Sequence, residues 1–305
     1  MKKQIVIACA VLASAFAFAG VDSPLTVMTY NIRCASGDRN SKDNNWLARR
    51  NHFANFVKRL NPDVVGFQEV LPEQFEWLKS QFPAYEFIGR GRNANGGGEA
   101  SPIAFRRKRF ASVVSGTFWL SETPDVPGSK GWDAALPRVC TYVVLIDKVT
   151  GKKFSFANTH TDHMGEAARE NGMLLVIERM KNFGKGAPIV FVGDHNCLEW
   201  EKPARAVSKV LKDALYLSET PPKGAWRTFN FWHWKDKEHS IVDVLKLDIH
   251  ERSVPGPMSD QKRIDYIYVS KGVKVLSYKT DPSPRPGTKL YPSDHFPSLA
   301  KIVIP

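Results

Sequence analysis

The chain is poor in cysteine, in long apolar runs and in low-complexity sequence. Its 305 residues include four cysteines, too few for a scaffold of this length to be held together by disulfides. One long apolar run is present, near the N-terminus, which excludes a protein with several membrane spans. Hydrophobic residues at 43% and charged residues at 24% are ordinary globular values, so a wholly disordered chain is also excluded.

The first nineteen residues have the pattern of a secretory signal peptide. Two lysines follow Met1, and an apolar, alanine-rich run covers residues 5–18. Two small-x-small patterns predict cleavage after Ala17 or Ala19. No change of composition divides the remainder. We therefore expect a secreted or periplasmic protein with a single domain over residues 20–305.

Cleavage at this point leaves three cysteines, Cys34, Cys140 and Cys197, which permit at most one internal disulfide. It also removes two of the twelve net positive charges of the chain. The remaining positive charge fits an anionic ligand such as a phosphate ester or a nucleic acid, but an ordinary basic surface explains it equally well. Residues 106–109 (RRKR) form the one compact basic group.

Short runs of β-forming residues alternate with a few helical stretches. The predicted strands cover residues 25–30, 64–67, 103–105, 112–120, 141–146, 154–158, 189–192, 264–269 and 299–304. The predicted helices cover residues 46–60, 72–81, 166–183 and 203–211. This order predicts two packed sheets with helices on the outside.

Two long stretches without a regular pattern are expected to be loops. Residues 89–101 (GRGRNANGGGEAS) predict a mobile, exposed loop, and residues 218–262 place an aromatic cluster, Trp226 to Trp234, among many charges. Long loops on a rigid scaffold commonly recognise substrate, so we expect both to control specificity. A small core beneath the loop is the alternative explanation for the aromatic cluster.

Polar side chains recur at the ends of the predicted strands. Each has a common structural explanation when taken alone, such as a solvated loop carboxylate, a hydrogen-bonded core histidine or an Asx turn. Six strand ends nevertheless deliver Asn, Glu, Asp or His, at Asn31, Glu69, His160, Asp194, Asp265 and His295. If these strand ends lie at the same end of the predicted sheets, their side chains surround a single cleft.

The residue types in this set favour one kind of chemistry. Carboxylate and amide oxygens suit Mg²⁺ or Mn²⁺ and argue against a thiolate zinc site. They are offered by Asn31, Glu69, Asp194, Asn196 and Asp294. Histidines such as His160 and His295 can transfer protons near neutral pH. A hard divalent metal combined with an acid/base histidine is typical of phosphoester hydrolysis by water.

The motifs YNIR, GFQE, NTHTDH, GDHN, RIDYIYVS and SDHFP follow one another between Thr29 and Pro297. In this order and spacing the sequence resembles the endonuclease/exonuclease/phosphatase superfamily, which has the DNase-I-like fold. Residues 89–99, 118–125 and 131–141 resemble a narrower branch of exported bacterial proteins. The resemblance implies an α/β (α+β) fold, a four-layered sandwich of two mixed β-sheets packed face to face with outer helices.

The resemblance also implies a role for each motif residue. Glu69 is expected to be the principal metal ligand, with Asn31 beside it binding metal or a phosphate oxygen and Asp294 completing the metal site. Asp194 is expected to orient or deprotonate the attacking water, and Asn196 to hold a phosphate oxygen.

Three further roles concern the histidines. His295 is expected to bind the scissile phosphate or act as acid/base, with Asp265 fixing its orientation. His160 resembles a second acid or a phosphate donor.

Four residues near these motifs allow two interpretations. Arg138 could clamp a phosphate with its guanidinium or be a buried structural arginine, and we expect it to bind substrate. Asp162 and His163 fit a second metal site and a hydrogen-bonded structural role about equally. For His195 a structural role is favoured.

The leading hypothesis is an exported, Mg²⁺- or Mn²⁺-dependent phosphoester hydrolase, with phosphodiesterase and phosphatase activity both open. A secreted endonuclease acting on DNA or RNA is the nearest alternative, because the sequence pI is about 9.5. A lipid or sugar phosphodiesterase also remains open, since the tryptophans could contact sugar rings or a membrane interface. The intact catalytic set argues against a non-catalytic binding protein. We expect a monomer.

Overall fold

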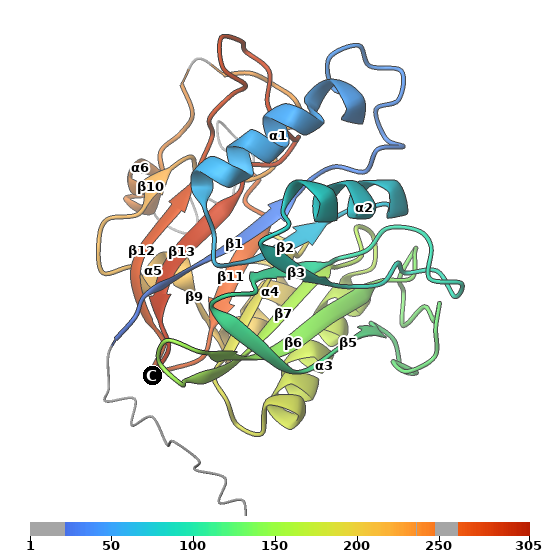
Figure 1. The fold of residues 1–305 in the computed structure, drawn as a ribbon, viewed down its shortest axis with the longest axis vertical. Coiled ribbons are helices and arrows are strands. Elements are labelled where there is room, and N and C mark those ends of the chain that lie inside the picture. Colours follow the sequence, from blue (N-terminus) through green and yellow to red (C-terminus); the bar gives the residue numbers. More distant parts are fainter. Residues whose placement is uncertain (1–21, 236, 248–261) are drawn as a thin grey trace, which may run out of the picture.

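The computed structural model describes residues 22–235, 237–247 and 262–305, so the predicted signal peptide and part of the second long loop lie outside the described residues. Two mixed β-sheets pack face to face, and helices cover both outer surfaces (Figure 1). Within the described ranges no helix has the length and apolar character needed to cross a membrane. The predicted fold class is confirmed.

The first sheet has the strand order β10-β12-β13-β1-β2-β4-β3. In chain order its strands are β1 (Leu25–Asn31), β2 (Val64–Gln68), β3 (Tyr85–Ile88), β4 (Ile103–Arg106), β10 (Lys223–Gly224), β12 (Lys274–Thr280) and β13 (Ser298–Val303). At the centre, β1 is parallel to β2 and antiparallel to β13. Every residue of β2 is buried, as expected for a central strand covered on both faces.

The second sheet has the order β5-β6-β7-β8-β11-β9. Its strands are β5 (Phe110–Trp119), β6 (Val139–Asp147), β7 (Lys153–His160), β8 (Ile189–Asp194), β9 (Lys212–Asp213) and β11 (Asp265–Val269). Strands β7 and β8 are parallel, and β11 is antiparallel to β8. Each sheet therefore has one central parallel pair.

The longer helices form the outer layers. Their bounds are α1 (Trp46–Leu60), α2 (Pro72–Gln81), α3 (Glu166–Gly184) and α4 (Lys202–Ser208), with two short helices α5 (Ala214–Leu217) and α6 (Ile241–Leu245). Helices α1 and α2 pack apolar side chains such as Phe53 and Leu78 on the first sheet. Helices α3 and α4 cover the second sheet through residues such as Met173 and Val207.

The predicted helices and strands are all present, with small shifts at their ends. The sequence prediction missed β3, β12 and the short elements β9, β10, α5 and α6. Strand β12 lacks a clean alternation of polar and apolar residues because a bulge shifts its register between Val275 and Ser277. Strand β3 lies at the edge of its sheet and is only partly buried, so its pattern is weak.

A buried polar contact joins the two sheets below the cleft. Gly66 of β2 lies so close to β7 that a Cβ atom at this position would be 2.5 Å from Cγ of Asn158. The Asn158 side chain crosses the gap and donates to the carbonyl oxygens of Phe67 (2.8 Å) and Pro102 (2.9 Å). Its oxygen accepts from Gln68 at 2.7 Å. The glycine of the GFQE motif therefore permits the close approach of the sheets.

We expect Gly66→Ala to reduce the free energy of unfolding by roughly 1–3 kcal/mol, because the added methyl group must displace Asn158 or Val192. Urea unfolding followed by circular dichroism measures this change. The control is Gly97→Ala, where the nearest atom to a new Cβ is the flexible side-chain oxygen of Asn95 at 3.2 Å. Equal stability of the two variants would show that the sheets do not need the glycine.

Candidate active site

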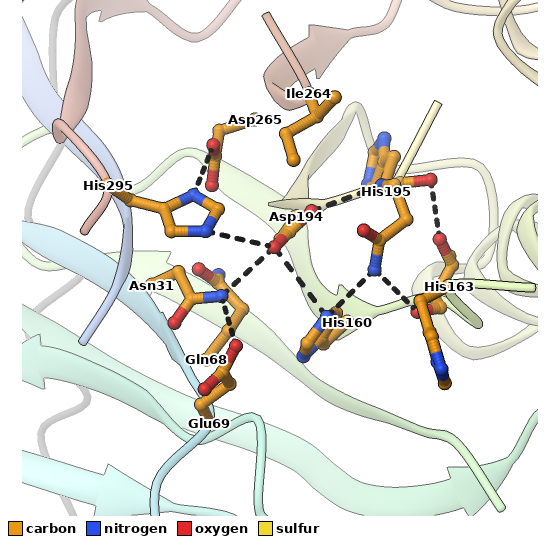
Figure 2. A network of polar contacts seen from close by, with 12 residues as sticks. Asn31, Gln68, Glu69, His160, His163, Asp194, His195, Ile264, Asp265 and His295 are labelled. Carbon is orange, nitrogen blue, oxygen red and sulfur yellow. Dashed lines mark hydrogen bonds and ion pairs between the residues drawn. The ribbon is translucent and has the colours of Figure 1, made fainter. Parts of the chain in front are cut away.

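The polar residues at the ends of β1, β2, β7 and β8 meet in one cleft at one end of the sandwich (Figure 2). Asn31 ends β1 and Glu69 follows β2, while His160 ends β7 and Asp194 ends β8 in the second sheet. Asp265 begins β11 directly opposite Asp194 in the register. The cleft has a volume of about 560 Å³. The parallel pairs β1–β2 and β7–β8 explain this convergence, because both pairs run toward the same end of the sandwich.

Asn31 joins acidic groups from both sheets. Its side-chain nitrogen donates to Oε1 of Glu69 and to Oδ2 of Asp194, both at 2.9 Å. Its oxygen accepts from the backbone N–H of Arg33 at 3.0 Å. In this arrangement Asn31 orients the two carboxylates, and all three side chains are buried.

Glu69 is held in its ionised form. Burial alone would raise its pKa, but hydrogen bonds from the Cys34 N–H (2.9 Å) and from Asn31, together with the charges of His295 and Arg33, lower the pKa below its usual value. Its backbone is left-handed, with φ of 60°. Such strained conformations of non-glycine residues concentrate at functional sites.

A carboxylate–histidine–carboxylate row crosses the floor of the cleft. His295 Nδ1 lies 2.8 Å from Oδ2 of Asp265, and His295 Nε2 lies 3.6 Å from Oδ2 of Asp194. Burial tends to lower the pKa of His295, but the charge and hydrogen bond of Asp265 raise it well above the usual value. Burial and the neighbouring Asp265 charge raise the pKa of Asp194. The structure therefore favours a charged His295 and an Asp194 able to take up a proton.

His160 and Asn196 form the opposite wall. Asn196 Nδ2 lies 2.9 Å from His160 Nε2, and Oδ2 of Asp194 lies 3.6 Å from the same nitrogen. Burial, followed by the positive charges of Arg138 and His295, lowers the pKa of His160 well below its usual value. A neutral imidazole is suited to bind a metal or accept a hydrogen bond, and less suited to donate a proton.

The donor atoms fit a hard divalent cation. Glu69, His160 and Asp194 each offer a ligand atom within 4.8 Å of the others, and Asp194, Asp265 and His295 form a second such group. Asp294 lines the same cleft outside both groups, with its Oδ2 3.6 Å from Nε of Arg33. Four buried carboxylates in one place repel one another, and a divalent cation with oxygen ligands would compensate their charge.

Asp162 is explained by its backbone contacts. Its carboxylate accepts hydrogen bonds from the N–H groups of Ala135, Leu136, Met164 and Gly165. These bonds tie the segment before β6 to the segment after β7 and lower the pKa of Asp162 despite its burial. Of the two interpretations of Asp162, the structure supports the structural one.

Arg138 lies in the cleft wall between acidic partners. Its side chain is 6% exposed, with Nε 3.6 Å from Oδ2 of Asp162 and its terminal nitrogen 3.2 Å from Nδ1 of His163. Both Arg138 and His163 line the cleft. Asp162 therefore positions Arg138 toward the space where a substrate would lie.

His195 belongs to the core. Its ring stacks on Tyr266 and Tyr268, with interplanar angles of 12° and 3°. Burial lowers its pKa to about 3, so the ring is neutral. The structural role favoured for His195 agrees with this position.

Residues 89–101 correct the expectation of a mobile, exposed loop. Backbone hydrogen bonds such as Arg92 N–H to Glu99 O (3.1 Å) and Asn93 N–H to Gly97 O (3.0 Å) fold the segment on itself. Arg92 then pairs with both carboxylate oxygens of Glu99 at 2.8 and 3.0 Å, and both residues line the cleft. Sequence reasoning missed this pair; the lone acidic residue of a glycine-rich stretch was its only signal.

The aromatic cluster divides into core and cleft residues. Trp226 is 3% exposed in the main core, and Trp232 and Trp234 pack on a small cluster with Tyr291. Trp226 and Trp232 therefore support the small-core alternative, whereas Trp234 also lines a pocket beside the cleft together with Phe231 and Lys262. The cleft is instead lined by Phe229 and by Phe231, which is 57% exposed.

Arg49 of α1 holds the segments that carry the site, and sequence reasoning missed it. Its guanidinium is buried and donates to the carbonyl oxygens of Ile32 (2.6 Å), Arg33 (2.8 Å) and Pro292 (3.1 Å). The first two follow Asn31, and Pro292 precedes Asp294. Arg49 thus fixes two of the six motifs relative to each other.

A two-sheet α/β sandwich with carboxylate, amide and imidazole groups around one cleft defines the DNase-I-like class. The family model described as "Endonuclease/Exonuclease/phosphatase family" matches residues 28–295. The chain therefore belongs to this family, which confirms the predicted family and its enzyme class, a hydrolase of phosphate ester bonds.

Similar proteins include two solved structures from Bacteroides thetaiotaomicron. One is an endonuclease/exonuclease/phosphatase family protein, with 34% identity and a TM-score of 0.81, covering 94% of this chain and 97% of that chain. The other is a mannosyl-6-phosphatase, with 35% identity and a TM-score of 0.78, covering 92% of this chain and 100% of that chain.

A curated relative is tyrosyl-DNA phosphodiesterase 2 of Bos taurus, 26% identical over 160 residues, which are 52% of this chain and 39% of the relative. The chain spans between 30% and 59% of the length of the curated relatives it matches.

The contact between Asp265 and His295 predicts coupled losses of activity. Asp265→Asn keeps the shape of the side chain but removes the charge that raises the pKa of His295. If a charged His295 is required, the alkaline limb of the pH–rate profile should move to lower pH in Asp265→Asn.

His295→Ala should lose at least ~10²-fold in rate, and the double variant should be scarcely slower, because residues that act as a unit are non-additive. Circular dichroism controls for folding. Fully additive losses, or an unmoved pH profile in Asp265→Asn, would contradict an orienting role for Asp265.

Proposed function

We propose that the protein is an exported, divalent-metal-dependent hydrolase of phosphate esters that activates water for in-line attack on phosphorus. One observation supports this proposal above all: the side chains of Glu69, Asp194 and His295, which come from two different sheets, lie close together in one cleft of small-molecule size. Export rests on the signal-peptide pattern of residues 1–19.

Glu69 would hold Mg²⁺ or Mn²⁺, with Asn31 orienting its carboxylate and with His160, Asp194 and Asp294 as the other candidate donors. When bound, the ion supplies Lewis-acid polarisation of a phosphoryl oxygen. Holding the ion also offsets the mutual repulsion of the buried carboxylates.

The remaining residues bind the phosphate and move protons. Asp194, with its raised pKa, takes the proton of the attacking water; as the new P–O bond forms, the bond from phosphorus to the alcohol oxygen breaks, and the alkoxide leaves and takes up a proton from solvent water. His295, kept charged by Asp265, binds the phosphate and stabilises the charge that develops on its oxygens. Asn196 holds a phosphate oxygen, and Arg138 contacts the substrate from the wall of the cleft.

We further propose a sugar phosphate monoester as the substrate class. A cleft of about 560 Å³ suits a small molecule. On one side it is bounded by Arg92, Glu99 and Arg138, which offer charged partners for hydroxyl groups, and on the other by the exposed ring of Phe231. The similarity to a mannosyl-6-phosphatase over nearly the whole chain supports the same choice.

The position of the compact basic group argues against a nuclease. Residues 106–109 begin with the last residue of β4. Arg106 pairs with Asp63 just before β2, whereas Glu69 follows the other end of that strand. The length of β2 thus separates this group from the cleft, whereas electrostatic contact with phosphates supplies most of the non-specific affinity of nucleic-acid-binding proteins.

Metal removal tests the proposed chemistry. EDTA should abolish hydrolysis, and added Mg²⁺ or Mn²⁺ should restore it. Glu69→Gln should weaken Mn²⁺ binding in isothermal titration and lower the rate by at least ~10²-fold. The matched control is Glu76→Gln, an exposed residue of α2 that pairs with Lys79. Full activity after exhaustive chelation would contradict the proposal.

A substrate panel tests the proposed substrate class. Sugar phosphates, p-nitrophenyl phosphate, bis-p-nitrophenyl phosphate, sphingomyelin, RNA and plasmid DNA are incubated with the purified protein and Mg²⁺ or Mn²⁺. We expect the highest kcat/KM for a sugar phosphate. A higher kcat/KM for the diester or for a nucleic acid would contradict the proposal of a sugar phosphate monoester as substrate. The proposal of a metal-dependent phosphoester hydrolase would still stand.

A further inference from the structure

A second pocket adjoins the catalytic cleft and has a volume of about 550 Å³. It shares Phe229, Phe231 and Lys262 with the lining of the cleft, so the two spaces meet at these side chains. The rest of its described lining does not border the cleft and consists of Arg227, Asn230, His233, Trp234 and Lys235. We call this second space the side pocket. None of these described residues is assigned to the metal or to the phosphate, so the catalytic chemistry does not explain the side pocket.

Phe231 stands at the boundary between the cleft and the side pocket in an unfavourable backbone conformation. Its ring is 57% exposed, although burial stabilises a phenylalanine side chain. Phe231 and the following Trp232 are both left-handed, with φ of 56° and 62°, a region that bulky residues seldom adopt. Such strain persists only where the surrounding structure enforces it, and it is concentrated at functional sites. The turn thus holds an apolar ring in solvent beside the cleft.

The turn is fastened to the segment just before the catalytic histidine. The backbone N–H of Asn230 donates to the carbonyl oxygen of Asp294 at 2.7 Å, and its side chain donates to the carbonyl oxygen of Ser293 at 3.1 Å. The side-chain oxygen of Asn230 accepts from the N–H of Trp232 at 2.8 Å. Because Asn230 is fully buried, these bonds fix the position of the turn relative to the catalytic site.

Arg227 holds the same turn through a second set of bonds. Its buried guanidinium donates to the carbonyl oxygens of Asn230 (3.4 Å) and His233 (2.9 Å). It also donates to both carboxylate oxygens of Glu238, at 2.5 and 2.7 Å. Glu238 neutralises the charge of Arg227, so this arginine shapes the side pocket and does not attract an anion into it. The side pocket is therefore preformed, which lowers the entropic cost of binding a ligand.

Three rings form a row from the phosphate-binding histidine to the side pocket. The ring centroids of His295 and Phe229 are 4.7 Å apart, and those of Phe229 and Phe231 are 4.2 Å apart. A substrate whose phosphate contacts His295 can extend along this row to Phe231. Any part of that substrate beyond the first sugar ring then enters the side pocket.

We propose that the side pocket binds a second sugar ring of the same substrate, so that the substrate class is a phosphorylated oligosaccharide. The proposal rests on the proposed function, which places the phosphorylated ring in the cleft. A pyranose ring has an apolar face of C–H groups and a rim of hydroxyl groups. The rings of Phe231 and Trp234 offer surfaces for the apolar face. His233, Lys235 and Lys262 lie in the same lining and offer donors for the hydroxyl groups.

The mixed lining distinguishes a sugar ring from other occupants. A lipid chain binds best to a continuous apolar surface, but Lys235 and Lys262 interrupt the aromatic surface of the side pocket. A nucleic acid could stack a base on Phe231, but the compact basic group that would contact its backbone is separated from the cleft by the length of β2. A sugar ring uses both the aromatic and the polar side chains.

Kinetics with substrates of two lengths test the proposal on the full chain. Mannose 6-phosphate and glucose 6-phosphate are each compared, in Mg²⁺, with α-linked disaccharides that carry the same phosphorylated ring at their non-reducing end. We expect kcat/KM to be at least about 10-fold higher for the preferred disaccharide, because a second ring buried against Phe231 adds binding energy away from the reacting phosphate. Equal kcat/KM for one and two rings in both series would overturn the proposal and leave the proposed hydrolase intact.

Variants of Phe231 locate the effect. Phe231→Ala removes the aromatic surface and should abolish the advantage of the disaccharide, whereas Phe231→Trp keeps such a surface and should retain it. The matched control is Tyr216→Ala on α5, where the ring is 51% exposed but borders neither the cleft nor the side pocket. Circular dichroism checks the folding of each variant. A disaccharide advantage that survives Phe231→Ala would place the second ring elsewhere and overturn the proposal.

NMR separates the sugar site from the hydrolase. Saturation-transfer difference spectra are recorded with millimolar mannobiose and maltose, which carry no phosphate. We expect transfer to the sugar C–H protons in the wild type and in Phe231→Trp, and its loss in Phe231→Ala. Transfer without hydrolysis of any sugar phosphate would contradict the proposed function and support the sugar site. No transfer in the wild type, or unchanged transfer in Phe231→Ala, would overturn the sugar site whatever the activity.

Discussion

The bridge from Asn31 to Glu69 and Asp194 is the contact on which the site depends. It joins acidic groups from two separate sheets through one buried amide, at 2.9 Å to each. A buried carboxylate without hydrogen bonds is strongly disfavoured, so the positions of β1, β2 and β8 must be fixed to within small distances. Two other contacts provide this: Asn158 crosses between the sheets above Gly66, and Arg49 holds the segments after β1 and before β13.

The direction of the central strands separates the charges of the molecule. In both sheets the two central strands are parallel, so the C-terminal ends of these strands, near Glu69 and Asp194, lie at one end of the sandwich. The lysine- and arginine-rich turns before these strands lie at the opposite end. The acidic end suits a cation and the phosphate that it polarises.

Local signals were sufficient to predict most of the fold. Helix α1 begins after Asn45, whose side chain caps the N–H of Ala48, and helix α2 begins with Pro72; both helices match their predicted bounds. The central strands were evident from their apolar runs. Strand β12 was missed because its bulge breaks the alternation, and the short strands carry too few residues to give a pattern.

The site was predictable only where a motif lies next to a strand end. Asn31, Glu69, His160, Asp194 and Asp265 meet because the strands carry them there. Arg92 and Glu99 reach the cleft through the folding of a glycine-rich segment, which no periodicity reveals. A buried arginine such as Arg49 cannot be distinguished in sequence from the exposed arginines of a helix.

Anomalous diffraction from crystals grown with Mn²⁺ tests the central claim most directly, namely that one cleft between the sheets is a metal-dependent hydrolytic site. The account predicts a strong anomalous peak beside the carboxylate of Glu69, at a metal–oxygen distance of about 2.0–2.3 Å, and its loss in Glu69→Gln. Absence of a peak in this cleft, or a peak only elsewhere on the protein, would contradict it.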